Sequence, residues 1–250
     1  MYGGELIYKT SDEHGSIEVV DFQQKIRSMH FGNKTQQSAM LLSNPFILIH
    51  KYSQAMMLPL SWINPQRVLM LGLGSGSIVK YLYNYYPELI IDTVELRQKV
   101  IELATDYFLL PEDNERFYIY NESAFDWLNA QAQTKYDIIF VDMFLTSSTG
   151  KDITISVSTY IEKIYHLLND NGVVVFNQLG DNVLSYPGIS RLSELFSHQL
   201  YSINIESVNN ILIATRGLIP ESIDTGEFHN IEIDYMLPYR SYFNRLTPVL

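Results

Sequence analysis

Residues 68–82, VLMLGLGSGSIVKYL, constrain the fold of this chain more than any other stretch. An apolar run that reads as a buried strand passes through Gly72, Gly74 and Gly76 and then takes up helical spacing of apolar residues. Glycine at such a turn permits positive φ and lets a ligand approach the backbone closely. A strand–glycine turn–helix unit therefore predicts a ligand site at the carboxyl end of the first strand of an open α/β sheet, the alternative being a tight turn alone.

The rest of the chain repeats the alternation of strand and helix. Apolar runs predict further strands, and 3.6-residue spacing predicts helices of about ten residues between them. Strands are expected at 90–95, 116–120, 136–142 and 171–179, with a closing hairpin over 201–215. This order predicts an α/β protein with a Rossmann-like class I methyltransferase fold, built on a seven-stranded, mostly parallel sheet.

The two ends of the chain differ from this pattern. Residues 16–22 and 25–31 alternate as strands do, so we expect a small N-terminal β-rich domain over residues 1–60. Residues 61–250 then form the Rossmann-like domain that binds the cofactor and carries catalysis. The segment 216–250 has no clear period and carries no structural prediction.

Composition excludes several classes of function. The formal charge of −11, from 28 acidic and 17 basic residues, argues against nucleic acid as a partner. There is no cysteine and no metal-ligand spacing among the six histidines, so no metal is expected. No apolar stretch reaches the roughly 18–20 residues of a membrane span, and the first residues do not resemble a signal peptide. We expect a cytoplasmic protein with no membrane partner.

The spacing of the glycines and one acidic residue point to a nucleoside. The turn reads G-L-G-S-G with Ser77 next, which is shorter than the G-x-G-x-x-G of dinucleotide sites and is typical of S-adenosylmethionine-type sites. The next predicted strand ends at Glu95, 19 residues after Gly76. An acid at this place accepts hydrogen bonds from ribose hydroxyls. The alternative for Glu95 is a solvent-exposed acid at a strand end.

Asp142 ends the predicted strand YDIIFVD and should face the same crevice as the glycine turn. A carboxylate after a run of apolar residues is costly to bury unless it is paired or used. It would anchor an amine, align it with an electrophilic carbon and take up its proton. The alternative is an acid that caps the following loop.

Taken together, these motifs resemble the spermidine synthase (polyamine aminopropyltransferase) family, and in particular its divergent bacterial spermidine synthase-like branch. The resemblance covers residues 8–215 and implies a transferase of polyamine biosynthesis that moves an aminopropyl group from decarboxylated S-adenosylmethionine to an amine such as putrescine. It also implies a homodimer with no tightly bound cofactor. The resemblance is carried by GSIEVVD, IRSMHFGNKTQQSAM, Tyr52, VLMLGLGSGS, TVELR, FLLPEDNERF, YDIIFVD and NGVVVFNQ.

The resemblance also implies roles for individual residues. Asp142 takes the catalytic position, and Tyr52 and Gln178 take positions that bind the substrate. The adenine-side acid of the family falls on Glu122 or Ser123, depending on the register. The remaining cofactor-binding positions are Gln37, Gly72, Gly74, Ser75, Gly76 and Glu95.

Several positions depart from the family pattern. Ser75 replaces an acid of the glycine turn that would favour the decarboxylated cofactor. Leu145 replaces the second acid of the D-x-x-D stretch, Ser53 and Gln54 replace the His-Glu that follows Tyr52, and Arg97 stands where the family has Asp. Losing carboxylates weakens the grip on a dication. Two alternatives therefore stay open: an S-adenosylmethionine-dependent methyltransferase, and a catalytically impaired nucleoside-binding relative.

Overall fold

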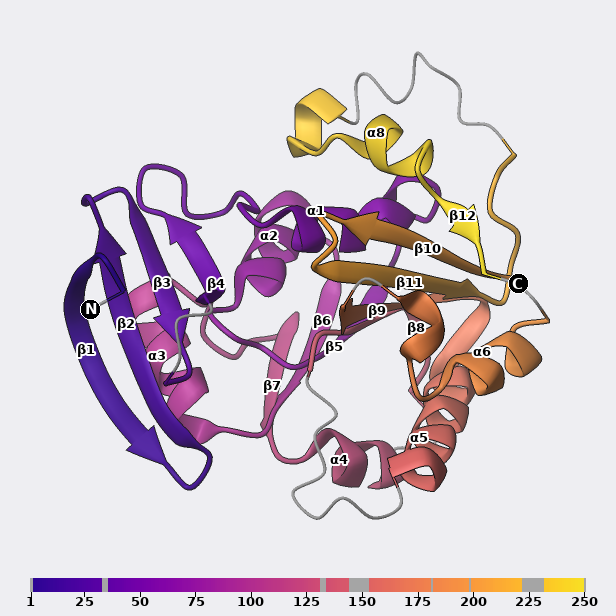
Figure 1. The fold of residues 1–250 in the computed structure, drawn as a ribbon, viewed down its shortest axis with the longest axis horizontal. Coiled ribbons are helices and arrows are strands. Elements are labelled where there is room, and N and C mark those ends of the chain that lie inside the picture. The colour runs from indigo at the N-terminus through magenta and orange to yellow at the C-terminus, as the bar shows by residue number, and fades with distance from the viewer. Residues whose placement is uncertain are drawn as a thin grey trace.

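The computed structural model describes residues 2–32, 36–130, 134–143, 153–180, 182–197, 199–221 and 232–249. A four-stranded antiparallel sheet in the order β1-β2-β3-β4 occupies one end of the molecule (Figure 1). Alternating side chains of its strands, such as Ile17 and Val19, face the core and are fully buried. The strands are β1 (Glu5–Asp12), β2 (Gly15–Phe22), β3 (Ile26–His30) and β4 (Gln36–Leu41).

The second sheet has eight strands in the order β12-β10-β11-β9-β8-β5-β6-β7. Strands β9, β8, β5, β6 and β7 are parallel to their neighbours, whereas β11, β10 and β12 add in antiparallel fashion. The predicted class I methyltransferase fold is confirmed, and the two-residue β12 makes eight strands where seven were expected. The strands are β5 (Arg67–Leu71), β6 (Ile90–Glu95), β7 (Phe117–Asn121), β8 (Tyr136–Val141), β9 (Leu168–Leu179), β10 (Leu200–Ile205), β11 (Asn209–Thr215) and β12 (Thr247–Pro248).

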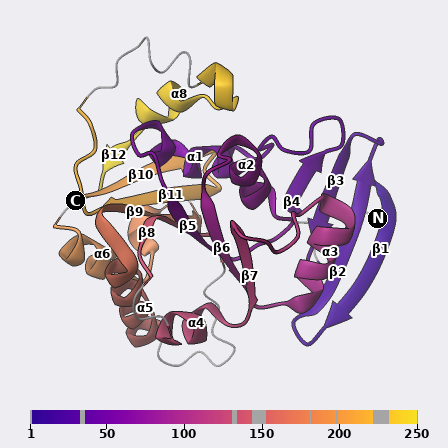
Figure 2. The same ribbon diagram turned by 180° about the vertical axis from the view of Figure 1, so that it is seen from behind.

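Helices cover both faces of this sheet (Figure 2). One buried cluster joins the N-terminal sheet, α1, α2, α3 and α8 to the large sheet, and a second joins α4, α5 and α6 to its other face. The central strands are apolar on both sides because both faces are covered. The helices are α1 (Lys51–Met56), α2 (Ser77–Tyr85), α3 (Gln98–Phe108), α4 (Ala124–Ala130), α5 (Ile153–Leu167), α6 (Ile189–Leu195) and α8 (Tyr239–Phe243), with 3-10 turns η1 (Leu58–Ser61) and η2 (Val183–Ser185).

The C-terminal segment, which the sequence left without a prediction, docks through tyrosines. The buried Tyr242 of α8 donates its hydroxyl to Gln54 Oε1 at 2.9 Å, and the Tyr81 hydroxyl of α2 donates to the Tyr235 carbonyl at 2.9 Å. Tyrosine hydrogen bonds therefore tie the described residues 232–249 to α1 and α2, and such contacts need no helical or strand periodicity in the sequence. None of the helices in the described part of the chain has the length and apolarity to cross a bilayer.

The strand order places the ligand edge of the sheet. The chain runs from β5 outward through β6 and β7, and then returns to β8 on the other side of β5. The order thus reverses between β5 and β8, and the carboxyl ends on either side of this reversal form a crevice, which is where open α/β sheets bind ligands.

Candidate functional site

A cavity of about 1,060 Å³ lies over the carboxyl ends of the strands. Its two parts come from opposite sides of the strand reversal. We call the part formed by Gly72, Gly74, Glu95 and Ser123 the glycine half. The aspartate half is formed by Asp142, Asn177, Leu179, Ile205, Val208 and Asn209. The turn after β5 and the end of β6 therefore open into the same space as the end of β8.

The glycine turn is shaped by close backbone approaches. Gly72 has φ +90°, and a Cβ there would lie 2.3 Å from the Asp142 carbonyl oxygen. Gly76 has φ +73°, and a Cβ there would lie 2.6 Å from Leu110 Cδ1. Only glycine fits such contacts at positive φ. Gly72 thus allows the turn to touch the end of β8, whereas Gly76 allows it to pack on Leu110, outside the cavity lining.

Glu95 is fixed by the backbone around it. Its Oε2 accepts from the Leu73 amide at 2.9 Å and its Oε1 accepts from the Arg97 amide at 2.9 Å. Burial raises the pKa of Glu95, although both backbone hydrogen bonds oppose that shift. Each carboxylate oxygen retains acceptor capacity, because each carries more than one lone-pair site. The two backbone hydrogen bonds therefore fix the orientation of the carboxylate and leave it with acceptor capacity.

Asp142 lies at the end of a hydrogen-bond relay across three strands. Its Oδ1 accepts from Asn177 Nδ2 of β9 at 2.8 Å, and Asn177 Oδ1 accepts from Asn209 Nδ2 of β11 at 2.8 Å. Burial raises the pKa of Asp142, while the hydrogen bonds from Asn177 and the Tyr52 hydroxyl favour the charged form. The carboxyl group is thereby held in place with a strengthened affinity for a proton.

Tyr52 and Gln37 join the wall between the two halves. Both residues line the cavity, and the Tyr52 hydroxyl lies 3.4 Å from the Gln37 carbonyl oxygen. Burial and the neighbouring Asp142 carboxylate raise the pKa of the Tyr52 hydroxyl well above its usual value. Tyr52 therefore remains a neutral hydrogen-bond donor beside the carboxylate.

Four of the predicted site residues are not part of the cavity lining: Ser75, Gly76, Glu122 and Gln178. Ser75 is fully buried, with its hydroxyl 3.0 Å from Ser77 Oγ and its amide donating to Ser38 Oγ at 2.8 Å. Glu122 is exposed, so of the two registers considered it is Ser123 that reaches the cavity. Leu145, which was expected to replace a family acid, lies outside the described residues.

Gln178 lies outside the cavity because side chains alternate between the two faces of a strand. Successive side chains of a strand point to opposite faces, so Asn177 faces the cavity and Gln178 faces the opposite side of β9. Gln178 Nε2 donates to the Asn182 carbonyl at 3.2 Å and to Ser185 Oγ at 3.0 Å. Asn177 and Asn209 were missed in the sequence. The apolar run before Asn177 held a signal for it, because alternation along 171–179 assigns only one of two adjacent amides to each face.

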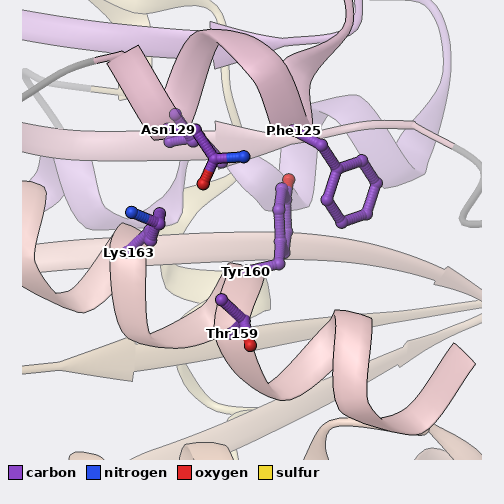
Figure 3. Close-up of a pocket in the computed structure, with 6 residues that line it drawn as sticks. Phe125, Asn129, Thr159, Tyr160 and Lys163 are labelled. Carbon is purple, nitrogen blue, oxygen red and sulfur yellow. The ribbon is translucent and has the colours of Figure 1, made fainter. Parts of the chain in front are cut away.

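A second, smaller cavity of about 210 Å³ lies between α4 and α5. Phe125, Asn129, Thr159, Tyr160 and Lys163 surround it (Figure 3). None of the predicted site residues lines it. Within the described ranges, we find no grouping of three acidic or histidine side chains suited to a metal ion.

Comparisons with known proteins show the family to which this chain is similar. The family profile described as "Spermine/spermidine synthase domain" matches residues 49–206. The polyamine aminopropyltransferase of Chromobacterium violaceum is 30% identical over 191 residues, which cover 75% of this chain and 71% of that protein. The eEF1A lysine and N-terminal methyltransferase of Xenopus laevis is 28% identical over 58% of this chain and 22% of its own length.

A solved structure shares the fold. A probable spermidine synthase from Corynebacterium glutamicum superposes with a TM-score of 0.73 at 19% identity, over 91% of this chain and 86% of the other. The profile match spans more than half of the chain and includes the glycine turn, Glu95, Asp142 and Asn177. The chain therefore belongs to the spermine/spermidine synthase family.

Proposed function

We propose that this protein transfers an aminopropyl group from decarboxylated S-adenosylmethionine to a primary amine, for which the family resemblance implies putrescine. One observation carries the proposal. A single cavity contains both a glycine turn with a fixed acid, Glu95, and a buried carboxyl group, Asp142, held by an amide and a phenol. The first arrangement suits an adenosine, and the second suits an amine nucleophile.

The chemistry needs orientation and one proton acceptor. The amine nitrogen attacks the propyl carbon bonded to the sulfonium, so that an N–C bond forms while the C–S bond breaks. The electron pair of the broken bond stays on sulfur, and methylthioadenosine leaves as a neutral thioether. The amine proton passes to Asp142, whose raised pKa makes it a stronger base than an exposed aspartate. Holding donor and acceptor in one cavity provides the remaining acceleration.

Product formation tests the proposal directly. The purified protein, decarboxylated S-adenosylmethionine and a panel of primary amines should yield methylthioadenosine, detected by mass spectrometry. Asp142→Asn should abolish this product and leave binding of the cofactor within about tenfold, because Asp142 is assigned to the amine and not to the adenosine. The exposed Asp126 of α4 offers a matched control, and Asp126→Asn should retain full turnover. Undiminished product from Asp142→Asn would contradict its role.

Methyl transfer is the second candidate, supported by the similarity to the Xenopus laevis methyltransferase and by Ser75, an uncharged residue at the place where the family resemblance expects an acid. Calorimetry with the two sulfonium nucleosides separates the candidates. Tighter binding of the decarboxylated form supports aminopropyl transfer, and equal or reversed preference supports methyl transfer. Binding of either nucleoside without any product would indicate the catalytically impaired relative.

We further propose a homodimer, as the resemblance implies, and a cytoplasmic location, as the composition indicates. We also propose a division into an N-terminal domain (1–60) and a catalytic domain (61–250). Sedimentation equilibrium of the purified chain tests the assembly. Cell fractionation tests the location, and limited proteolysis tests the domain boundary.

A further inference from the structure

We propose that the acceptor is a primary monoamine with an apolar tail, used in preference to a diamine of the same length. This inference rests on the proposed function and concerns the aspartate half of the cavity. Asp142 binds and deprotonates the reacting amine, so the specificity for the rest of the acceptor is set by the side chains that lie beyond Asp142.

Apolar side chains form the wall beyond Asp142. Leu179 ends β9, Ile205 ends β10, and Val208 lies in the turn between β10 and β11. Leu179 is 51% exposed and Val208 is 56% exposed, so both present hydrocarbon to an incoming ligand. Covering this surface with an alkyl chain is favourable, whereas placing a second ammonium against it removes water without supplying a partner.

The rim of this half carries a lysine. Lys51 and Glu206 both line the cavity, and their side chains form an ion pair. The Lys51 ammonium neutralises Glu206, so that this carboxylate offers no net negative charge to a second cation. Of the cavity-lining carboxylates among the described residues, Glu95 belongs to the glycine half, Glu206 is paired, and Asp142 remains for the amine.

Gln54, at a position where the resemblance expects an acid that grips a diamine, is engaged elsewhere. Its Nε2 donates to the Leu48 carbonyl at 2.7 Å, and its Oε1 accepts from the Tyr242 hydroxyl at 2.9 Å. Both ends of the side chain therefore serve the packing of α1 and α8. The structure thus gives the distal end of the acceptor an apolar surface and an ion pair without net charge.

A pair of amines of equal length tests this inference. With decarboxylated S-adenosylmethionine, 1-aminobutane should give a kcat/KM for methylthioadenosine formation at least about tenfold above that of 1,4-diaminobutane. Equal or better use of the diamine would overturn the inference while leaving aminopropyl transfer intact. Absence of methylthioadenosine with every amine would instead overturn the proposed function, and this inference with it.

Variants of the wall and rim give a second readout. Val208→Asp and Lys51→Met should each shift the diamine-to-monoamine ratio of kcat/KM toward the diamine, by roughly threefold to fivefold for an exposed charge. Val208→Ile and Lys25→Met are matched controls, the first with an apolar side chain and the second at an exposed lysine in the turn between β2 and β3, and they should leave the ratio unchanged. Ratios that do not move in either Val208→Asp or Lys51→Met would contradict the assignment of this surface.

Discussion

At the scale of single residues, the amide relay onto Asp142 separates this site from a strand-end acid that merely caps a loop. Asn209 orients Asn177, and Asn177 donates to Asp142. The hydrogen bond from Asn177 favours the charged carboxylate, while burial favours the neutral acid. Under the proposed function, Asn177 is therefore a positioning residue that also sets the pH range in which Asp142 would act as a base.

Replacing Asn177 by leucine should move the pH profile of the reaction. Loss of the hydrogen bond raises the pKa of Asp142, so the rising limb of kcat/KM against pH shifts to higher pH. Asn169→Leu is a matched control, because Asn169 donates to Asp137 at the opposite end of β8. If kcat falls while the rising limb of the pH profile stays at the same pH, Asn177 has only a structural role.

At the scale of secondary-structure elements, a buried lysine ties α2 to α3. Lys80 is 1% exposed, and its Nζ donates to the carbonyl of Phe108, the last residue of α3, at 2.7 Å. A cation at the C-terminus of a helix satisfies a free carbonyl and interacts favourably with the helix dipole. Burial nevertheless lowers the pKa of Lys80 to about 8.

The pH dependence of stability should report this lysine. Because the pKa of Lys80 is lower in the folded than in the unfolded chain, the unfolded state binds more protons between about pH 8 and 10.5, and the contribution of Lys80 to stability rises over that window. Urea titrations should show the wild type gaining up to about 3 kcal/mol relative to Lys80→Met as the pH rises through it. The exposed Lys99→Met should not show this gain, and parallel curves for wild type and Lys80→Met would refute the assignment.

At the scale of the whole molecule, Arg97 joins the N-terminal sheet to the glycine half of the cavity. Its guanidinium donates to both oxygens of Asp12 at 2.8 and 2.9 Å and to the Gly15 carbonyl at 3.0 Å. It also lies 4.7 Å from the centre of the Phe31 ring. The N-terminal sheet and the segments flanking its strands supply part of the cavity wall, namely His14, Phe31, Gln37, Ser38 and Ala39.

Breaking this link should weaken the binding of nucleosides. Asp12→Asn removes the charged partner of Arg97, and we expect the Kd for methylthioadenosine to rise about threefold to tenfold, since hydrogen bonds to charged groups contribute roughly 1.5–3 kcal/mol and only part of this reaches the ligand. Titration calorimetry with methylthioadenosine measures this Kd. Asp21→Asn, which breaks the Arg27 ion pair within the N-terminal sheet, is the control. An unchanged Kd with a lower melting temperature would limit Arg97 to folding.

How much of the site could be predicted depended on the kind of residue. Glu95 and Asp142 could be placed because each follows an apolar strand, and parallel strands bring their carboxyl ends to one edge of the sheet. Ser75 could not, because whether its side chain faces the cavity or a neighbouring element depends on contacts with a segment far away in the sequence, here Ser38. Gln178 was misplaced by one residue, since strand alternation puts it on the face opposite to Asn177.

The sequence by itself determined the sheet, the helices that cover it and the edge at which a ligand binds, because these follow from the local periodicity of apolar residues and the conformational freedom of glycine. Only the tertiary structure decided what surrounds the ligand. The amide relay onto Asp142, the Arg97 link, the Lys51 rim and the docking of the C-terminal segment join residues that are 32 to 191 positions apart. Such contacts produce no repeating pattern in the sequence, because they form only when elements from distant parts of the chain pack against one another.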